Sequence, residues 1–125
     1  MYEENEDVNS QVLCDTIVEG MQENKAQDIV ILDLRDITAA VADFFVICSG
    51  ESSTQVDGIT SSVVRHARKE IQERPWHTEG KGTSEWVLID YVTVVAHVFY
   101  KTAREFYDLE DLWADAKRIN VPNLD

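Results

Sequence analysis

The chain has 125 residues, of which 44% are hydrophobic and 28% charged, and its formal net charge at pH 7 is −13. This length and composition indicate one globular domain with a single core, and no apolar run approaches the roughly 20 residues needed to cross a bilayer. The acidic balance makes free nucleic acid a poor partner, because phosphate binding requires Lys and Arg; it suits a basic protein partner, and it also suffices for solubility alone.

The N-terminal half predicts a helix followed by two strands. Residues 1–8 are expected to form a flexible acidic tail, and an acidic start is not the basic head of a signal peptide. Apolar residues at helical spacing predict an amphipathic helix over residues 10–24. Residues 28–34 and 43–50 predict strands, and the continuous apolar character of the second is typical of an interior strand.

The C-terminal half predicts a helix, a hairpin and a last helix. Ser52 opens a capping box, and the helix that it begins ends before Pro75. Residues 85–90 and 93–100 predict two strands, most simply a hairpin. Residues 101–118 predict a final helix whose apolar face carries Phe106, Leu109, Trp113 and Ala116, and Asp108 is placed to cap this helix again, with Asp111 following. The order α-β-β-α-β-β-α favours an α/β sandwich with a mixed sheet.

We expect these elements to form one domain over residues 9–118, followed by a C-terminal tail over residues 119–125. Cys14 and Cys48 lie far apart in apolar segments, and the chain has no CxxC motif. Two isolated buried thiols fit a reducing cytoplasm better than a disulfide framework or a metal site. The sequence therefore predicts a cytoplasmic protein that has no metal site and no cofactor.

An enzymatic alternative depends on the turn at Gly50. A strand-to-helix turn is a place where backbone N–H groups bind phosphate. Nucleotidyltransferases add paired carboxylates that hold metal ions, and the helix after Gly50 has no such pair. A small nucleotidyltransferase or phosphohydrolase would therefore need two or more carboxylates to converge near this turn, and Asp33, Asp43 and Asp90 are the plausible suppliers. We expect no catalytic residues.

The segment from Trp86 to Phe99 is almost entirely strand-forming, but it contains Asp90 and His97, which a buried strand pair does not need. A lone histidine in a strand is usually structural. Alternation places residues 86, 88 and 90 on one face of the sheet and residues 87, 89 and 91 on the other. If helices leave one face uncovered, its aromatic and aliphatic side chains mark an interface; the alternative is that helices cover both faces.

A second feature is the basic face of the helix before Pro75, where Arg65, Arg68 and Lys69 lie near His66. Such a face is most often simply solvated. On an acidic protein it is also suited to phosphate or to an acidic partner.

Several segments together resemble the ribosomal silencing factor family, which is also called RsfS or Iojap-like. The matching segments are Lys25-Ala26-Gln27-Asp28-Ile29-Val30-Ile31-Leu32-Asp33, Ala42-Asp43-Phe44-Phe45-Val46-Ile47-Cys48-Ser49-Gly50-Glu51-Ser52-Ser53, Glu79-Gly80, Trp86-Val87-Leu88-Ile89-Asp90-Tyr91, Val94-Val95-Ala96-His97-Val98-Phe99 and Arg104-Glu105-Phe106-Tyr107-Asp108-Leu109-Glu110-Asp111-Leu112-Trp113. Each segment alone is weak, but their order and spacing are specific and cover nearly the whole chain.

The resemblance implies a nucleotidyltransferase-like sandwich without catalytic residues, and a homodimer. It implies binding to the large ribosomal subunit through ribosomal protein fourteen, so that joining of the small subunit is blocked and translation is repressed when nutrients are short. The family's contact surface is the sheet around the hairpin, which carries over to Trp86, Leu88, Asp90, Tyr91 and His97. A dimeric scaffold for another partner is the third interpretation.

The chain departs from the family pattern at one turn. The family usually has Gly-Asp after the position of Tyr91, whereas this chain has Val92-Thr93. A two-residue hairpin turn prefers Gly or Asn because it needs positive φ. We therefore expect a turn that is wider or differently shaped.

Overall fold

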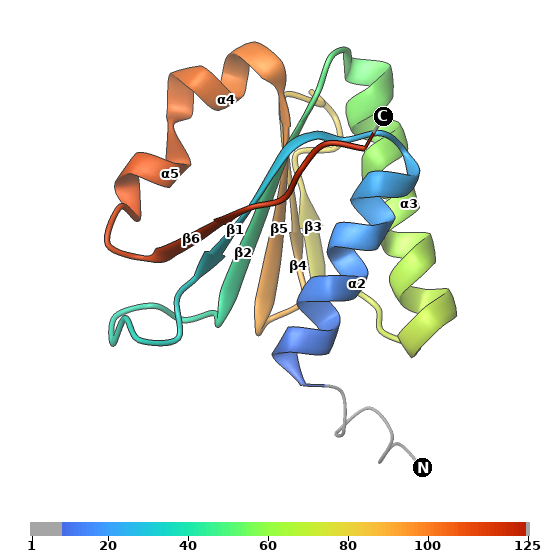
Figure 1. Cartoon of the computed structure of the whole chain (residues 1–125). Helices are drawn as coiled ribbons and strands as arrows, with labels where there is room; N and C mark the ends of the chain where they lie inside the picture. The colour runs from blue at the N-terminus through green and yellow to red at the C-terminus, as the bar shows by residue number, and fades with distance from the viewer. Residues whose placement is uncertain (1–8, 125) are drawn as a thin grey trace.

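The computed structural model describes residues 9–124, and the acidic tail expected over residues 1–8 lies outside them. The labels follow Figure 1. The helices are α2 (Ser10–Glu23), α3 (Ser53–Ile71), α4 (Lys101–Tyr107) and α5 (Leu109–Leu112). The strands are β1 (Gln27–Asp33), β2 (Phe44–Gly50), β3 (His77–Glu79), β4 (Trp86–Asp90), β5 (Val94–Tyr100) and β6 (Lys117–Asn120).

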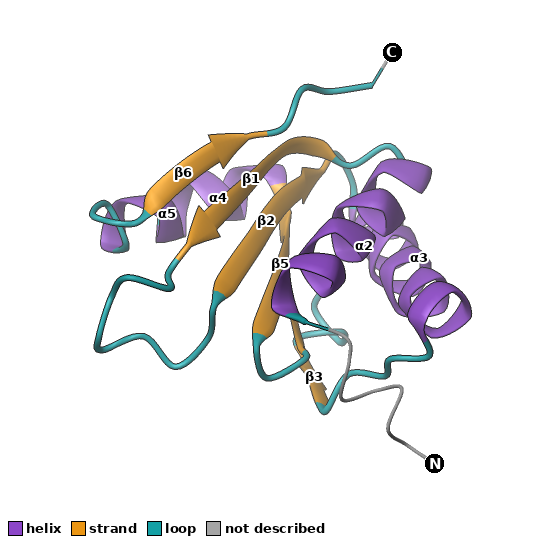
Figure 2. Ribbon diagram, turned by 60° about the horizontal axis from the view of Figure 1, so that its bottom comes forward, coloured by secondary structure: helices purple, strands orange, loops and turns teal. Residues whose placement is uncertain are grey.

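The strands form one mixed sheet in the order β3-β4-β5-β2-β1-β6. Strands β2 and β5 pair in parallel, and all other pairs are antiparallel, so the predicted mixed α/β sheet and the β4–β5 hairpin are confirmed. Helices α2 and α3 cover one face of the sheet, and α4 with α5 lies over the other (Figures 1 and 2). The two helical layers are unequal, because α4 and α5 are much shorter.

Each face of the sheet has its own apolar cluster. The larger cluster lies beneath α2 and α3 and includes Ile17, Val46, Ile59 and Val98, all of them fully buried. The smaller lies beneath α4 and α5 and includes Leu32, Ile47, Phe99 and Leu109. Burial on both faces explains why the interior strands are continuously apolar.

Local sequence signals set where the two long helices begin. The side chain of Asn9 caps α2 by accepting a hydrogen bond from the Val12 N–H at 2.9 Å. Ser52 caps α3 in the same way, accepting from the Gln55 N–H at 3.1 Å, while the Gln55 Oε1 accepts from the Glu51 N–H at 2.7 Å. These bonds satisfy backbone donors that a helix start leaves unpaired, as the capping box predicted.

The C-terminal region differs from our expectation. The predicted helix over residues 101–118 ends at Tyr107, because Asp108 adopts a left-handed conformation with φ 47°. Residues Lys117–Asn120 then form β6, which pairs with β1, and the Asn123 side chain accepts from the Asp28 N–H at 2.8 Å. Strand β6 thus crosses residue 118 and was not expected from the sequence, because a short, exposed edge strand lacks the apolar alternation that sequence patterns detect.

The β4–β5 turn is differently shaped but not wider. Val92 and Thr93 form its two-residue loop, and the Tyr91 N–H donates to the Val94 carbonyl at 2.9 Å. Val92 adopts φ 75°, a conformation that a β-branched side chain disfavours. The Asp90 carboxylate accepts from the Val92 N–H at 2.7 Å and so helps to hold this backbone in place.

Replacing Val92 by glycine should therefore stabilise the protein. The Val92 side chain is 57% exposed, so little apolar burial is lost, while the unfavourable positive φ is relieved. We expect the free energy of unfolding to rise by about 1 kcal/mol, seen as a higher Tm in a calorimetric or circular dichroism melt. Thr93→Gly is the control and should not stabilise. An unchanged or lower Tm for Val92→Gly would contradict the strain assignment.

Candidate functional site

The face of the sheet beneath α4 and α5 is only partly covered. Alternation places Trp86, Leu88 and Asp90 of β4 on this face, and each keeps part of its surface exposed, whereas Val87 and Ile89 on the other face are fully buried. The face beside α2 and α3 is thus closed, and the face beside α4 and α5 remains partly open.

Aromatic side chains gather on this open face. The Trp86 ring stacks on Phe99 with centroids 4.9 Å apart and contacts Tyr107 of α4 at 4.8 Å. The ring of His97 meets Phe45 edge-on at 4.7 Å. These five residues, which we call the aromatic cluster, connect β2, β4 and β5 to α4.

A hydrogen bond within the cluster defines the protonation state of His97. The Trp86 Nε1–H donates to the His97 Nδ1 at 3.0 Å, so Nδ1 is an acceptor and the neutral ring carries its proton on Nε2. Nε2 is buried and has no hydrogen-bond partner in the described part of the chain. Burial lowers the pKa of His97 from 6.5 to about 4, because desolvation disfavours the charged ring.

The lowered pKa of His97 predicts a loss of stability in mild acid. The folded state binds fewer protons at His97 than the unfolded state between the folded pKa of about 4 and the unfolded value of 6.5. The contribution of His97 is therefore complete above pH 6.5, and about 3 kcal/mol is lost as the pH falls to about 4. Urea unfolding across this range measures it. His97→Asn should have a flatter profile, and identical profiles for the two proteins would contradict the assignment.

The structure brings together four of the five expected contact residues. Trp86, Leu88 and Asp90 lie on the open face, and His97 lies on the same face but is only 3% exposed. Tyr91 does not join them, because it packs into the cluster beneath α3 and is 6% exposed. Burial raises the pKa of the Tyr91 hydroxyl, which lacks a hydrogen-bond partner among the described residues.

Helices α4 and α5 add exposed apolar side chains that the hairpin pattern did not indicate. Phe106 is 80% exposed, Leu112 75% and Tyr107 48%. The periodicity placed Phe106 on the buried side of one long helix, and the break at Asp108 turns it outward. The available signal was Asp108, because aspartate favours helix ends over helix interiors. We call Trp86, Leu88, Phe106, Tyr107 and Leu112 the docking face.

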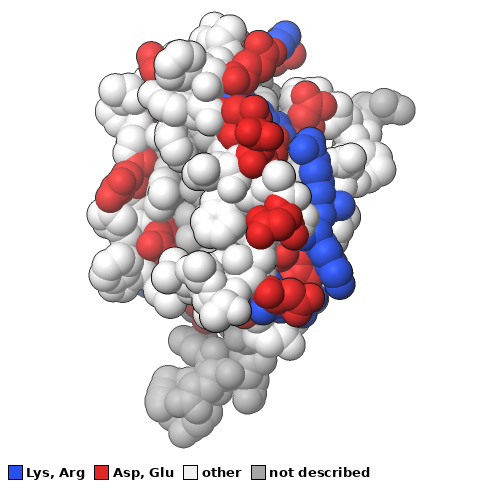
Figure 3. All heavy atoms as spheres, turned by 90° about the vertical axis from the view of Figure 1, so that its left-hand side faces the viewer, with Lys and Arg blue, Asp and Glu red and all other residues white. Residues whose placement is uncertain are grey.

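Acidic groups lie beside the docking face. Figure 3 shows a broad area of uncharged atoms next to a column of acidic groups, beyond which runs a narrower column of basic groups. The exposed carboxylates of α4 and α5 include Glu105, Asp108 and Asp111. This arrangement is suited to a partner that has an apolar contact area and a basic rim.

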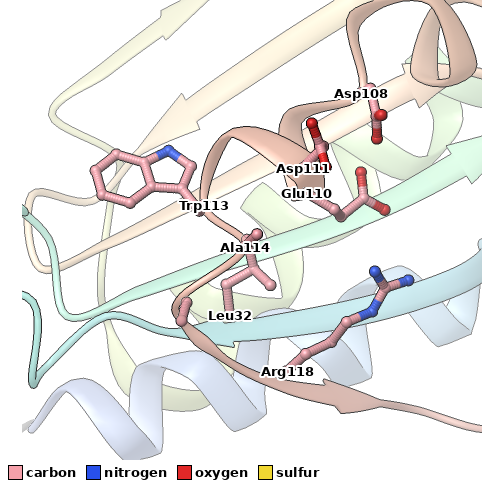
Figure 4. A pocket seen from close by; sticks show the side chains of 8 residues that line it. Leu32, Asp108, Glu110, Asp111, Trp113, Ala114 and Arg118 are labelled. Carbon is pink, nitrogen blue, oxygen red and sulfur yellow. The ribbon is translucent and has the colours of Figure 1, made fainter.

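A hollow of about 240 Å³ opens between α5 and β6 (Figure 4). Asp108, Glu110 and Asp111 line it together with Arg118, whose side chain extends towards Glu110 in Figure 4. Glu110 is already paired, because Arg104 donates to its carboxylate at 2.7 and 3.1 Å. The hollow is thus a polar border of the docking face with structural contacts of its own.

The carboxylates that an enzymatic site would need lie far from Gly50. Asp33 pairs with Phe44 and Asp90 with Val95, so both lie at the end of the sheet where β2 begins, and Asp43 directly precedes that strand. Gly50 ends the seven-residue β2, roughly 20 Å away at 3.3 Å per residue. The Asp33 carboxylate is held by Arg35 at 2.8 Å, which lowers the pKa of that carboxyl.

Both cysteines lie in the core, as expected. Cys14 and Cys48 are free thiols with no exposed surface, and burial raises the pKa of each to about 12. Within residues 9–124, no helix has the length and apolar character that a membrane crossing requires. Over the same residues, no three His, Cys, Asp or Glu side chains are placed to hold a metal ion.

Comparison with known proteins identifies one family. The family described as "Ribosomal silencing factor during starvation" matches residues 7–125. The chain is 37% identical to ribosomal silencing factor RsfS of Halalkalibacterium halodurans, over 94% of this chain and 98% of that protein. It is 42% identical to the RsfS of Bacillus subtilis, over 75% of this chain and 78% of that protein. A crystal structure of a Chromobacterium violaceum protein, 31% identical, superposes with a TM-score of 0.80 over 86% of this chain and 88% of that one.

Proposed function

This chain belongs to the ribosomal silencing factor family, and we propose that its docking face binds ribosomal protein fourteen of the large subunit. Members of the family are ribosome-binding factors and not enzymes, and this chain is a ribosomal silencing factor. The observation that carries the proposal is the partly open sheet face, where Trp86 contacts Tyr107 of α4 and the two short helices add the exposed Phe106 and Leu112. Aromatic and aliphatic anchors of this kind dominate the energetics of protein interfaces.

The charge of the chain supports a ribosomal protein as the partner. Ribosomal proteins are typically basic, and this chain has a net charge of −13. Opposite charges speed the encounter and orient the two surfaces before the apolar contacts form. Asp90 lies at the end of β4 on the docking-face side, and Asp108 and Asp111 line the hollow beside α5. These acids would meet the basic rim of the partner.

In the proposed mechanism, the bound factor acts only by steric exclusion. It occupies the surface of the large subunit that meets the small subunit, so that joining is blocked and translation is repressed when nutrients are short. Trp86 and Leu88 contact the partner directly, as do the exposed side chains of α4 and α5. His97 lies beneath them and holds Trp86 in place through the bond to its indole N–H.

We further propose a cytoplasmic homodimer with a nucleotidyltransferase-like sandwich that has no catalytic machinery. The reduced state of Cys14 and Cys48 supports the compartment, and their complete burial means that no disulfide links the copies. The strand-to-helix turn after Gly50, where Ser52 caps α3, supports the lineage, and among residues 9–124 no three His, Cys, Asp or Glu side chains are placed to hold a metal ion.

Removing two exposed docking-face side chains should weaken ribosome binding and leave the fold intact. Phe106→Ser with Leu112→Ser removes apolar anchors that are 80% and 75% exposed. We expect the affinity for purified large subunits, measured by co-sedimentation, to fall at least about tenfold. The same variant should no longer prevent added small subunits from joining.

The matched control is Val12→Ser, which removes an apolar side chain that is 41% exposed on α2, in the opposite layer. It should bind like the unmodified protein. If both proteins bind equally well, or if Val12→Ser loses binding and the double variant does not, the docking face lies elsewhere.

A further inference from the structure

Helix α3 and the loop after it carry a concentration of positive charge that the docking face does not use. Residues 65–74 hold four of the eleven Lys and Arg side chains of the chain and only two carboxylates. The four cations are all exposed: Arg65, Arg68, Lys69 and Arg74. None of them lies within 4.0 Å of a carboxylate of residues 9–124. On a chain with a net charge of −13, this is a local concentration of positive charge.

The helical geometry shows which way this region faces. The Asp57 carboxylate accepts a hydrogen bond from the Ser84 hydroxyl at 2.6 Å, so this side of α3 is turned towards the segment that leads into β4. Arg68 follows Asp57 by eleven residues, which is close to three full turns, and therefore lies on the same side. Arg65 is less than a quarter turn away from that line. Arg68 thus lies on the side of α3 nearest to this segment, and Arg65 lies on the exposed side of α3 that faces away from the sheet.

Trp76 extends the basic region to the edge of the sheet. Its side chain is 74% exposed, and its backbone N–H donates to the Asp90 carbonyl at 2.8 Å. Asp90 ends β4, the strand that carries Trp86 and Leu88. The loop over residues 72–76 thus runs from the end of α3 to β3 at the edge of the sheet (Figure 1). We call Arg65, Arg68, Arg74 and Trp76 the edge surface.

We propose that the edge surface contacts ribosomal RNA, with the arginines on backbone phosphates and Trp76 stacked on an unpaired base. This inference deepens the proposed function and rests on it, because the RNA would lie beside the protein that occupies the docking face. Guanidinium groups pair with phosphate oxygens in a fixed fork geometry, and an exposed indole provides a stacking platform for any base. The contact needs no sequence readout.

The observations favour RNA over an acidic protein segment. An acidic segment explains the arginines but leaves a large, exposed aromatic ring without a role. A large ribosomal subunit presents RNA around its proteins, so a factor seated on one of them has phosphates at its rim. The acidic remainder of this chain repels RNA, so contact at a single basic edge would also fix the orientation of the factor.

The test compares charge removal at the edge surface with the same change elsewhere. The variant is Arg65→Gln with Arg68→Gln and Arg74→Gln, and the control is Lys25→Gln with Lys101→Gln and Lys117→Gln, three exposed cations away from this edge. Binding of the full chain to purified large subunits is measured between 50 and 200 mM KCl. We expect the edge variant to bind about tenfold more weakly at 100 mM salt and to lower the slope of log affinity against log salt by about 2.

Two further measurements identify the partner. Trp76→Ala should weaken subunit binding by at least about fivefold, and ultraviolet cross-linking of the unmodified protein should join Trp76 to ribosomal RNA. Binding to isolated ribosomal protein fourteen should be unchanged in all these variants. Equal subunit binding by the edge variant and its control would overturn the inference. A cross-link from Trp76 to protein only would also overturn it, as would an edge variant that loses as much affinity for isolated ribosomal protein fourteen as for subunits. One outcome separates the two proposals. If the unmodified chain does not bind isolated ribosomal protein fourteen, the proposed function fails; if the edge variant nevertheless binds subunits more weakly than the unmodified chain, the RNA contact stands.

Discussion

Trp86→Ala should reduce both stability and ribosome binding, because Trp86 belongs to the core and to the docking face. The truncation removes stacking on Phe99 at 4.9 Å and contact with Tyr107 at 4.8 Å, and it deprives the His97 Nδ1 of its donor. Substitutions of large aromatic core residues by alanine cost about 3–5 kcal/mol of unfolding free energy. Because Trp86 is partly exposed, we expect a loss of about 3 kcal/mol. Urea unfolding measures this loss.

The binding loss must be separated from the stability loss. Co-sedimentation with large subunits, done under conditions where the variant is folded, should show a loss of about thirtyfold or more. Trp86→Phe keeps most of the ring packing but lacks the indole N–H, so it should lose about 1–2 kcal/mol of stability and retain most of the binding. A Trp86→Ala protein that is less stable but binds normally would show that Trp86 is only a core residue. The contact would then have to be sought on α4 and α5.

The central fold was predictable from sequence because its signals are local and strong. Continuous apolar runs identified β2 as an interior strand, the capping box at Ser52 gave the start of α3, and alternation separated Trp86 and Leu88 from Val87 and Ile89. Each signal depends on a few neighbouring residues whose preferences agree with the tertiary structure.

The C-terminal region was not predictable by the same reasoning. Asp108 was recognised as a residue that can cap the helix again, but its left-handed conformation has no sequence signature as strong as glycine, so one helix was expected over residues 101–118 and Phe106 was placed on the wrong side. Strand β6 is exposed at all four positions, and its pairing with β1 depends on contacts between distant parts of the chain. The docking face depends on this region, which is why the sequence located its hairpin part and not its helical part.

Arg104→Met should be among the most destabilising single substitutions in the chain. The Arg104 side chain, which is 11% exposed, donates to the Glu110 carboxylate, to the Asp28 carbonyl at 2.7 Å and to the Ser49 hydroxyl at 2.9 Å. These bonds join α4, α5, β1 and β2 at one side chain. Its removal deprives the Glu110 carboxylate, also 11% exposed, of its ion-pair partner, at an expected cost of about 3–5 kcal/mol.

A double-mutant cycle separates the ion pair from the rest of this network. Removing both charges, as in Arg104→Met with Glu110→Gln, avoids the unpaired carboxylate and should recover about half of the loss or more. The unrecovered part reflects the bonds to Asp28 and Ser49, which also fix α4 and α5 against the sheet. Subunit binding should therefore remain weaker in the double variant even where its fold is restored, because Tyr107 loses its fixed position beside Trp86. A loss below about 1 kcal/mol for Arg104→Met would mean that solvent replaces these bonds and that α4 and α5 are held by apolar packing alone.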